Sequence, residues 1–153
     1  MKNMIYIAIC DDEEIPIRYI KNKLEQELQK MEVTSYQLDI YYSGVDLLKN
    51  KKTYDILLLD IEMPEMDGFS VAKGMNQLKK KPLIIFLTSH REFMSKGYHV
   101  KAFRYLLKPI SDQEFQEAIF SAIKEITSFQ GVMKKTEKAK KSSISMKSCI
   151  LKH

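Results

Sequence analysis

The chain is poor in the residues and runs that mark secreted and membrane-spanning proteins. Its 153 residues include only two cysteines, Cys10 and Cys149, and no tryptophan. Two cysteines so far apart do not make a disulfide framework, so we expect free thiols and a cytoplasmic protein. No apolar run approaches the roughly 18 residues of a membrane helix. Residues 1–4 also lack the apolar stretch and cleavage site of a signal peptide. We therefore expect no membrane partner.

Most of the chain lacks a net positive charge, and the excess of positive charge is concentrated at its end. Residues 129–153 hold seven Lys and a single Glu, a charge of +6, whereas residues 1–128 hold 18 Lys and Arg against 19 Asp and Glu, a charge of −1. We predict a folded domain over residues 1–128 and a basic linker or tail over residues 129–153. Within the tail, Ser143–Ile150 alternates weakly and could form a single strand that has no partner in this chain.

Apolar runs alternate with helical patterns through the first 128 residues. The runs predict strands at residues 5–9, 36–42, 54–59, 83–87 and 103–107. Between and after them, apolar residues recur at three- and four-residue steps, weakly in residues 91–98, and predict helices. Strict alternation indicates a parallel sheet with helices on both faces. We therefore expect a doubly wound, flavodoxin-like α/β fold with strand order 2-1-3-4-5.

Polar side chains stand at the ends of four of these runs. Asp11 and Asp12 follow the first, Asp60 ends the third, Thr88 the fourth and Lys108 the fifth. Open α/β sheets bind ligands at the carboxyl ends of their strands. Converging carboxylates repel one another unless a cation is present, and Mg²⁺ accepts both carboxylate and phosphate oxygens. The pattern predicts a magnesium and phosphoryl site in which Asp60 is the nucleophile.

These residues resemble the motifs of the receiver domain of bacterial two-component response regulators. The matching pieces are Asp11-Asp12, Asp60 with Met63–Gly68, Thr88-Ser89 and Tyr105–Pro109, and the resemblance covers residues 3–128. It implies that Asp60 accepts a phosphoryl group from a sensor histidine kinase. It also implies that the carboxylates of Asp11, Asp12 and Asp60, with the backbone carbonyl of Glu62, hold Mg²⁺.

The resemblance assigns roles to the other strand ends as well. Thr88 and Lys108 would contact the phosphoryl group, and Tyr105 would be the switch aromatic that turns inward when Thr88 moves. Glu62 and His90 stand at positions that tune hydrolysis of the aspartyl phosphate in this family. The bond from Lys108 to the following proline is typically cis there. Phosphorylation would change the face made by the fourth helix, the fifth strand and the fifth helix, which could form a homodimer.

The stretch Lys101–Ile110 resembles receivers that precede a LytTR-type DNA-binding domain in transcription regulators. Such an output domain needs on the order of 100 residues, and about two dozen remain after the receiver. We therefore expect DNA binding only through an output domain largely missing from this chain. The chain is then a piece of a longer protein, a truncated gene product or a stand-alone receiver that acts through protein–protein contacts.

An enzyme remains the alternative from a different functional class. Phosphatases with an Asp nucleophile use a similar sheet, but they usually carry a second Asp two residues later, where this chain has Glu62. We therefore expect no enzyme activity beyond the domain's own phosphorylation and dephosphorylation.

Overall fold

The structure is a computed structural model that describes residues 4–96 and 100–134. The chain forms two compact units, Met1–Ala122 and Ile123–His153. The strand predicted at Ser143–Ile150 lies outside the described residues, and the domain boundary at residue 128 stays a prediction. In the described part of the chain, no helix has the length and apolar character needed to span a bilayer.

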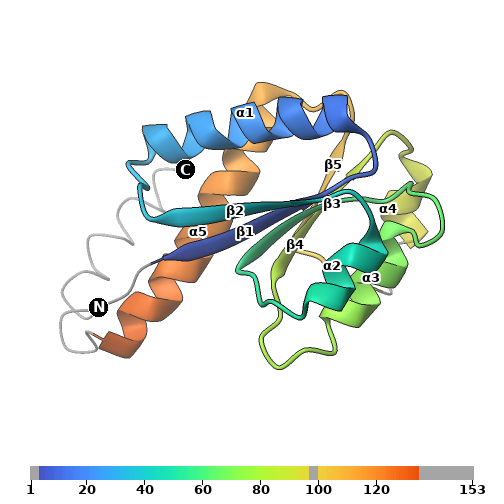
Figure 1. The fold of residues 1–153 in the computed structure, drawn as a ribbon. Coiled ribbons are helices and arrows are strands. Elements are labelled where there is room, and N and C mark those ends of the chain that lie inside the picture. The colour runs from blue at the N-terminus through green and yellow to red at the C-terminus, as the bar shows by residue number, and fades with distance from the viewer. Residues whose placement is uncertain (1–3, 97–99, 135–153) are drawn as a thin grey trace. The chain divides into compact units, whose positions relative to one another are not determined.

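Five parallel strands form one sheet in the order β2-β1-β3-β4-β5, as the sequence predicted (Figure 1). Their bounds are β1 (Ile5–Cys10), β2 (Tyr36–Tyr41), β3 (Ile56–Asp60), β4 (Leu83–Thr88) and β5 (Arg104–Leu107). The strand order reverses between β1 and β3, which are neighbours in the sheet. Their register pairs Cys10 with Leu59. The residues that follow these two, Asp11 and Asp60, therefore leave the sheet side by side.

Five helices connect and follow the strands in residues 4–96 and 100–134. They are α1 (Glu14–Lys30), α2 (Gly44–Asn50), α3 (Gly68–Met75), α4 (Glu92–Lys96) and α5 (Asp112–Lys134), the last of which begins in the first unit and ends in the second. Serine hydroxyls cap the starts of α2 and α5. The hydroxyls of Ser43 and Ser111 each accept a hydrogen bond from the backbone N–H three residues on, both at 3.1 Å. The helix expected over residues 91–98 is described only as the shorter α4.

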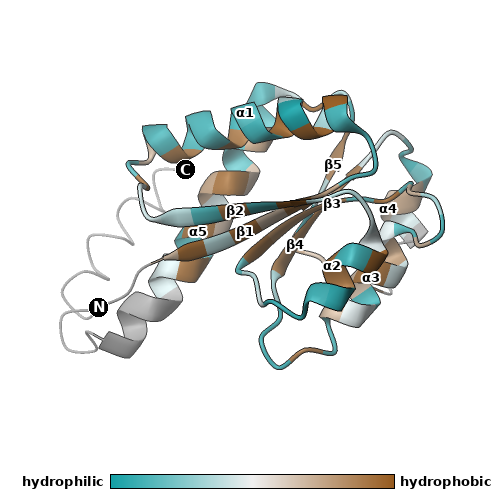
Figure 2. Ribbon diagram, in the orientation of Figure 1, coloured by the Kyte–Doolittle hydropathy of each residue, from teal (hydrophilic) through white to brown (hydrophobic). Residues whose placement is uncertain are grey.

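The core lies on both faces of the sheet, which explains why the strands have continuous apolar runs. All side chains of Ile56–Leu59 are fully buried. Helix α1 lies over one face and turns its apolar side toward it (Figures 1 and 2). On the other face, one cluster joins Leu57 and Leu59 to Leu47 of α2 and Val71 of α3. The rigid, buried centre of the sheet thus carries the strand ends at which the polar residues stand.

Candidate functional site

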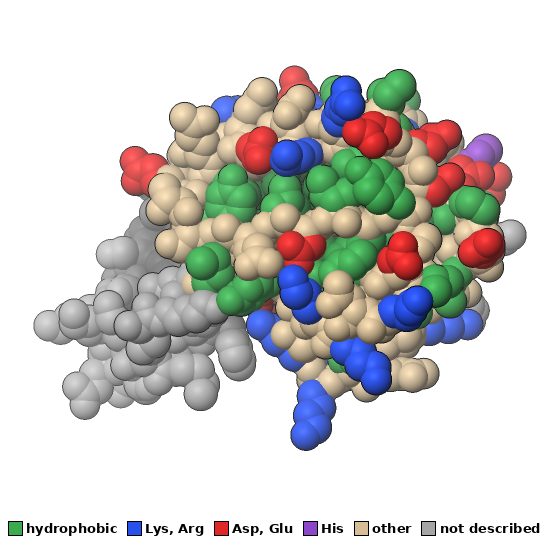
Figure 3. Space-filling model, viewed as in Figure 1, with side chains coloured by type: hydrophobic (Ala, Val, Ile, Leu, Met, Phe, Trp, Pro, Cys, Tyr) green, Lys and Arg blue, Asp and Glu red, His purple; other side chains and the backbone are tan. Residues whose placement is uncertain are grey.

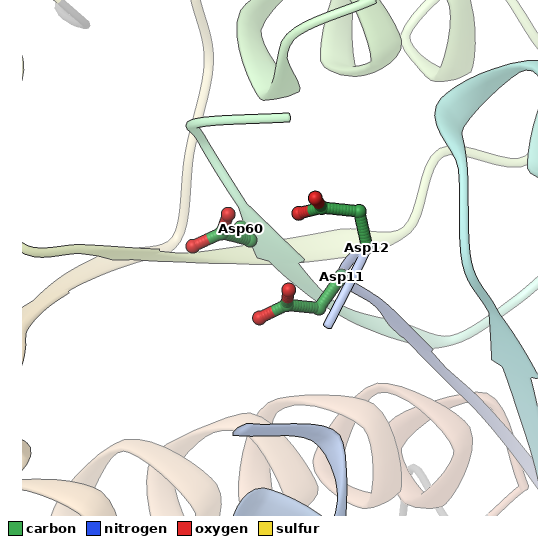
Figure 4. A group of neighbouring side chains, drawn as sticks. All are labelled: Asp11, Asp12 and Asp60. Carbon is green, nitrogen blue, oxygen red and sulfur yellow. The ribbon is translucent and has the colours of Figure 1, made fainter. Parts of the chain in front are cut away.

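Three carboxylates meet at the carboxyl end of the sheet. Asp11 and Asp12 follow β1 and Asp60 ends β3, and Figure 4 shows their side chains directed into the same space. One oxygen from each lies within 4.8 Å of the others. Asp11 and Asp60 are only 4% and 6% exposed, whereas Asp12 is exposed to solvent. The sequence therefore identified a real cluster, located where the strand order reverses.

The surroundings of the cluster disfavour the ionised forms of its two buried carboxylates. Burial raises the pKa of Asp60 to about 6; the hydrogen bond from Lys108 opposes this, and the charges of Asp11 and Asp12 add to it. Burial also raises the pKa of Asp11, against the backbone N–H of Glu13, which donates to its Oδ1 at 2.9 Å. A buried acid cluster with an exposed third carboxylate suits a divalent cation that keeps several water ligands. The residues present therefore fit Mg²⁺.

Lys108 provides a positive charge from the end of β5. Its Nζ donates to Asp60 Oδ1 at 2.9 Å and lies 3.6 Å from Asp11 Oδ2. Burial lowers the pKa of Lys108, but the hydrogen bond and charge of Asp60 outweigh it, and the net direction is upward. The lysine is therefore charged and held beside the two buried carboxylates. The peptide bond from Lys108 to Pro109 is cis, as the resemblance implied.

The loop after β3 needs a glycine where it closes. The N–H of Gly68 donates to the carbonyl of Ile61 at 2.8 Å, which folds the loop back onto the end of the strand. A Cβ at Gly68 would lie 2.5 Å from the backbone oxygen of Asp60. Asp67 then caps α3 by accepting the N–H of Ser70 at 2.9 Å. The Asp-Gly pair thus fixes the backbone that carries Asp60.

Thr88 is fully buried at the end of β4, and its hydroxyl accepts the backbone N–H of His90 at 3.0 Å. Its contact with a phosphoryl group stays a prediction. His90 is exposed, and its Nε2 lies 3.1 Å from a carboxylate oxygen of Glu62. This pair links the loop after β4 to the loop after β3. The sequence predicted a role for both residues but not the contact between them, because they stand 28 positions apart on different loops.

Tyr105 on β5 packs inward rather than outward. Its ring stacks on Phe86 of β4 with centroids 5.1 Å apart and planes at 26°. Its hydroxyl is buried and has no hydrogen-bond partner among the described residues, and burial raises its pKa. Tyr105 thus lies inward while Thr88 still accepts the N–H of His90, and its role as a switch stays a prediction.

Further aromatic rings extend this contact toward the site. Phe86 meets Phe69 of α3 edge-on at 5.3 Å, and Phe69 meets Phe93 of α4 at 6.0 Å. Phe93 in turn lies 5.8 Å from the ring of His90. This row of rings runs from Tyr105 to the His90–Glu62 pair. The row was not predicted from the sequence; the signal available was the position of Phe69 directly after Asp67-Gly68 and of Phe93 three residues after His90.

Fold and site together define a doubly wound α/β domain with an acidic cluster, partly neutralised by a lysine, at its switch point. The model of the response regulator receiver domain matches residues 7–120. The chain therefore belongs to the response regulator receiver family of two-component systems. Its sheet order and its structural neighbours agree on the flavodoxin-like receiver fold.

Relatives of known sequence support the subgroup predicted from Lys101–Ile110. The sensory transduction protein LytT of Enterococcus faecalis is 30% identical over 122 residues, covering 80% of this chain and 49% of that protein. A response regulatory protein of Vibrio cholerae is 33% identical over 111 residues, covering 72% of this chain and 42% of that protein. The chain thus spans about half the length of the curated relatives it matches. The response regulatory domain of MrkE from Klebsiella pneumoniae superposes with a TM-score of 0.67 at 23% identity, covering 79% of this chain and 99% of that domain.

Proposed function

We propose that this domain is a phosphorylation switch in which Asp60 accepts a phosphoryl group from a sensor histidine kinase. The observation that supports this most strongly is the joint placement of Asp60, two further carboxylates and Lys108 at one end of the sheet. A carboxylate oxygen of Asp60 forms the new bond to phosphorus, and the bond from phosphorus to the donor's imidazole nitrogen breaks. The donor nitrogen leaves with its electron pair and is protonated.

The charges around Asp60 suit this transfer. Asp11, Asp12, Asp60 and the backbone carbonyl of Glu62 would hold Mg²⁺, which neutralises charge on the transferred group. Lys108 Nζ, now 2.9 Å from Asp60, is placed to contact a phosphoryl oxygen attached there. Thr88 would reach another oxygen after releasing the N–H of His90, which its hydroxyl now accepts.

That release connects the phosphate to the surface. When the Thr88 side chain moves toward the phosphoryl group, it vacates space beside β4 and β5, and Tyr105 is the aromatic that responds. Phosphorylation then shifts an equilibrium between two arrangements of the α4–β5–α5 face. We infer that this face forms a homodimer.

The His90–Glu62 pair is placed to tune how long the phosphate lasts. The two side chains join the loop that follows Asp60 to the loop after β4, with Nε2 and the carboxylate 3.1 Å apart. In that position they limit the approach of the water that hydrolyses the aspartyl phosphate. The alternative in which this receiver acts alone, through protein–protein contacts, uses the same switch.

The output is proposed from the relatives. Two of them carry the names sensory transduction protein LytT and transcriptional regulatory protein YpdB, from Bacillus subtilis and Escherichia coli. We infer that the switch controls transcription through a LytTR-type DNA-binding domain.

Acetyl phosphate tests the phosphoacceptor directly. With Mg²⁺, intact-mass measurement of the wild type should show one added phosphoryl group, and addition of EDTA should abolish it. Asp60→Asn should not gain the group, whereas Asp46→Asn, the same change at an exposed carboxylate of α2, should behave as wild type. Absence of any adduct on the wild type, or an unchanged adduct on Asp60→Asn, would overturn the proposal.

A further inference from the structure

Exposed lysines gather where β3 and β4 begin, at the end of the sheet opposite Asp60. The end of α2 and the loop to β3 carry three of them, and α3 with the loop to β4 carries four. Figure 3 shows their blue side chains over the lower ends of these elements. Five of the seven have no ion-pair partner in the described part of the chain, and we name this set the lysine edge: Lys49, Lys51, Lys73, Lys79 and Lys81.

The fold brings the two groups of lysines together. Helices α2 and α3 pack so closely that a Cβ on Gly74 would lie 2.9 Å from a methyl group of Leu48. Strands β3 and β4 are paired in register, with Ile56 opposite Leu83, so the loops that enter them are neighbours. Lysines from residues 49–51 and 79–81, distant in sequence, therefore share one surface.

Two acidic residues anchor these loops without cancelling their charge. Asp55 is buried, accepts the N–H of Tyr6 at 2.8 Å and pairs with Lys80 at 2.7 Å. Asp39 pairs with Lys52 at 3.0 Å in the same way. The two acids thus pair with one lysine in each loop, and the flanking lysines, which belong to the lysine edge, face solvent.

Helix ends explain only part of this arrangement. A cation in the last turn of a helix interacts favourably with the helix dipole, which accounts for Lys49 in α2 and Lys73 in α3. Lys51 is the C-cap of α2 and gains from the same effect, whereas Lys79 and Lys81 lie beyond α3 and gain little from it. Like charges held together repel, so this surface is suited to an anionic partner.

The side chains present indicate which kind of anion fits. The lysine edge contains neither arginine, which reads bases and carboxylates in a bidentate manner, nor an aromatic ring, on which single-stranded bases stack. It also lacks the exposed large apolar residues that insert into membranes; those of the described chain are Ile15, Tyr19, Tyr42, Val45 and Phe120. Ammonium point charges alone suit the regularly spaced phosphates of a duplex.

We propose that the lysine edge binds the phosphate backbone of duplex DNA without reading its sequence. This contact belongs to the receiver domain itself and is separate from any output domain. It lies at the opposite end of the sheet from Asp60, so it does not require phosphorylation. In a full regulator it would add non-specific affinity and hold the receiver against DNA beside the bound output domain.

Fluorescence anisotropy of the full 153-residue chain with a labelled duplex of roughly 30 bp and arbitrary sequence tests this. The contribution of the basic tail to DNA binding must be distinguished from that of the lysine edge. The edge variant changes its five lysines to Gln, and the matched tail variant changes five others to Gln: Lys134, Lys135, Lys138, Lys140 and Lys141. Each neutralised phosphate contact adds about 0.9 to the steepness of log affinity against log salt. With one contact for each of the five lysines, the edge variant should lower this steepness by up to about 4.5 between about 50 and 200 mM salt.

The edge variant should also lose at least tenfold in affinity at the lower salt, while its circular dichroism and its Mg²⁺-dependent phosphorylation match the wild type. Binding lost in the tail variant and kept in the edge variant would overturn the proposal, as would no binding by the wild type. A parallel arm uses phosphatidylserine vesicles. Edge-dependent binding to vesicles without binding to DNA would assign the surface to membranes instead.

Discussion

Asp60 carries conflicting demands at the scale of a single residue. The proposed role requires that it be buried enough to be shielded from water and still ionised enough to attack phosphorus. Burial raises its pKa to about 6, while Lys108 at 2.9 Å favours the ionised form. The carboxylate is therefore mostly charged at neutral pH, although its burial disfavours the charged form. A cation or a phosphoryl group bound there relieves that cost.

Tyr105 gives the first prediction at this scale. Its buried hydroxyl has no partner in the described structure, and such a group costs about 1–3 kcal/mol. Tyr105→Phe should therefore leave the free energy of unfolding unchanged or raise it by about 1 kcal/mol, measured by urea denaturation.

Tyr54 is the matched control, because its buried hydroxyl donates to Asp39 at 2.6 Å. Tyr54→Phe should lower the free energy of unfolding by about 1–2 kcal/mol. A loss of that size in Tyr105→Phe would mean that its hydroxyl has a partner in solution.

The loop between β3 and α3 gives the prediction at the scale of elements. A Cβ at Gly68 meets the backbone oxygen of Asp60 at 2.5 Å, whereas a Cβ at Gly74 meets only the end of the Leu48 side chain at 2.9 Å. Gly68→Ala should destabilise the domain by about 2–3 kcal/mol and slow phosphorylation by acetyl phosphate, because the strand end must shift.

Gly74→Ala is the control within the same helix. The shift of the flexible leucine is offset by about 1 kcal/mol of improved helix propensity, so stability should change little and phosphorylation should match the wild type. Thermal melts and the rate of adduct formation measure both variants. Equal effects at the two glycines would show that the Asp60 backbone does not need this close approach.

The same elements explain what the sequence could predict. Apolar runs such as Ile56–Leu59 marked the strands because both faces of a parallel sheet are buried, and apolar residues at three- and four-residue steps marked the helices because only one face of each packs on the sheet. The local pattern and the expected topology together were enough to predict that Asp11 and Asp60 lie close to each other.

Contacts between separate loops could not be predicted in this way. The pairing of His90 with Glu62 and of Asp55 with Lys80 depends on how turns approach one another, which no periodicity encodes. The row of rings from Tyr105 through Phe86 and Phe69 to Phe93 likewise depends on side-chain packing across four elements. These tertiary contacts can be seen only in the three-dimensional structure.

At the scale of the whole molecule, folding, protonation and metal binding are linked through the acid cluster. The folded-state pKa of Asp60, about 6, lies above its ordinary value of 3.8, and that of Asp11 is also raised. The folded protein therefore holds these protons more tightly than the unfolded chain. Without metal, this contribution to stability is full below about pH 4 and is lost as the pH rises through about 6.

Mg²⁺ should reverse that loss, because it binds the deprotonated carboxylates of the folded state only. The rise in Tm on adding saturating Mg²⁺ should be small at about pH 5 and larger by several degrees at about pH 7.5. In Asp60→Asn the metal-free protein should lose less stability over this range, and the Mg²⁺ effect should shrink at the higher pH. Differential scanning fluorimetry with EDTA as the reference gives both quantities. A Mg²⁺ effect independent of pH, or unchanged in Asp60→Asn, would place the cation away from the three carboxylates.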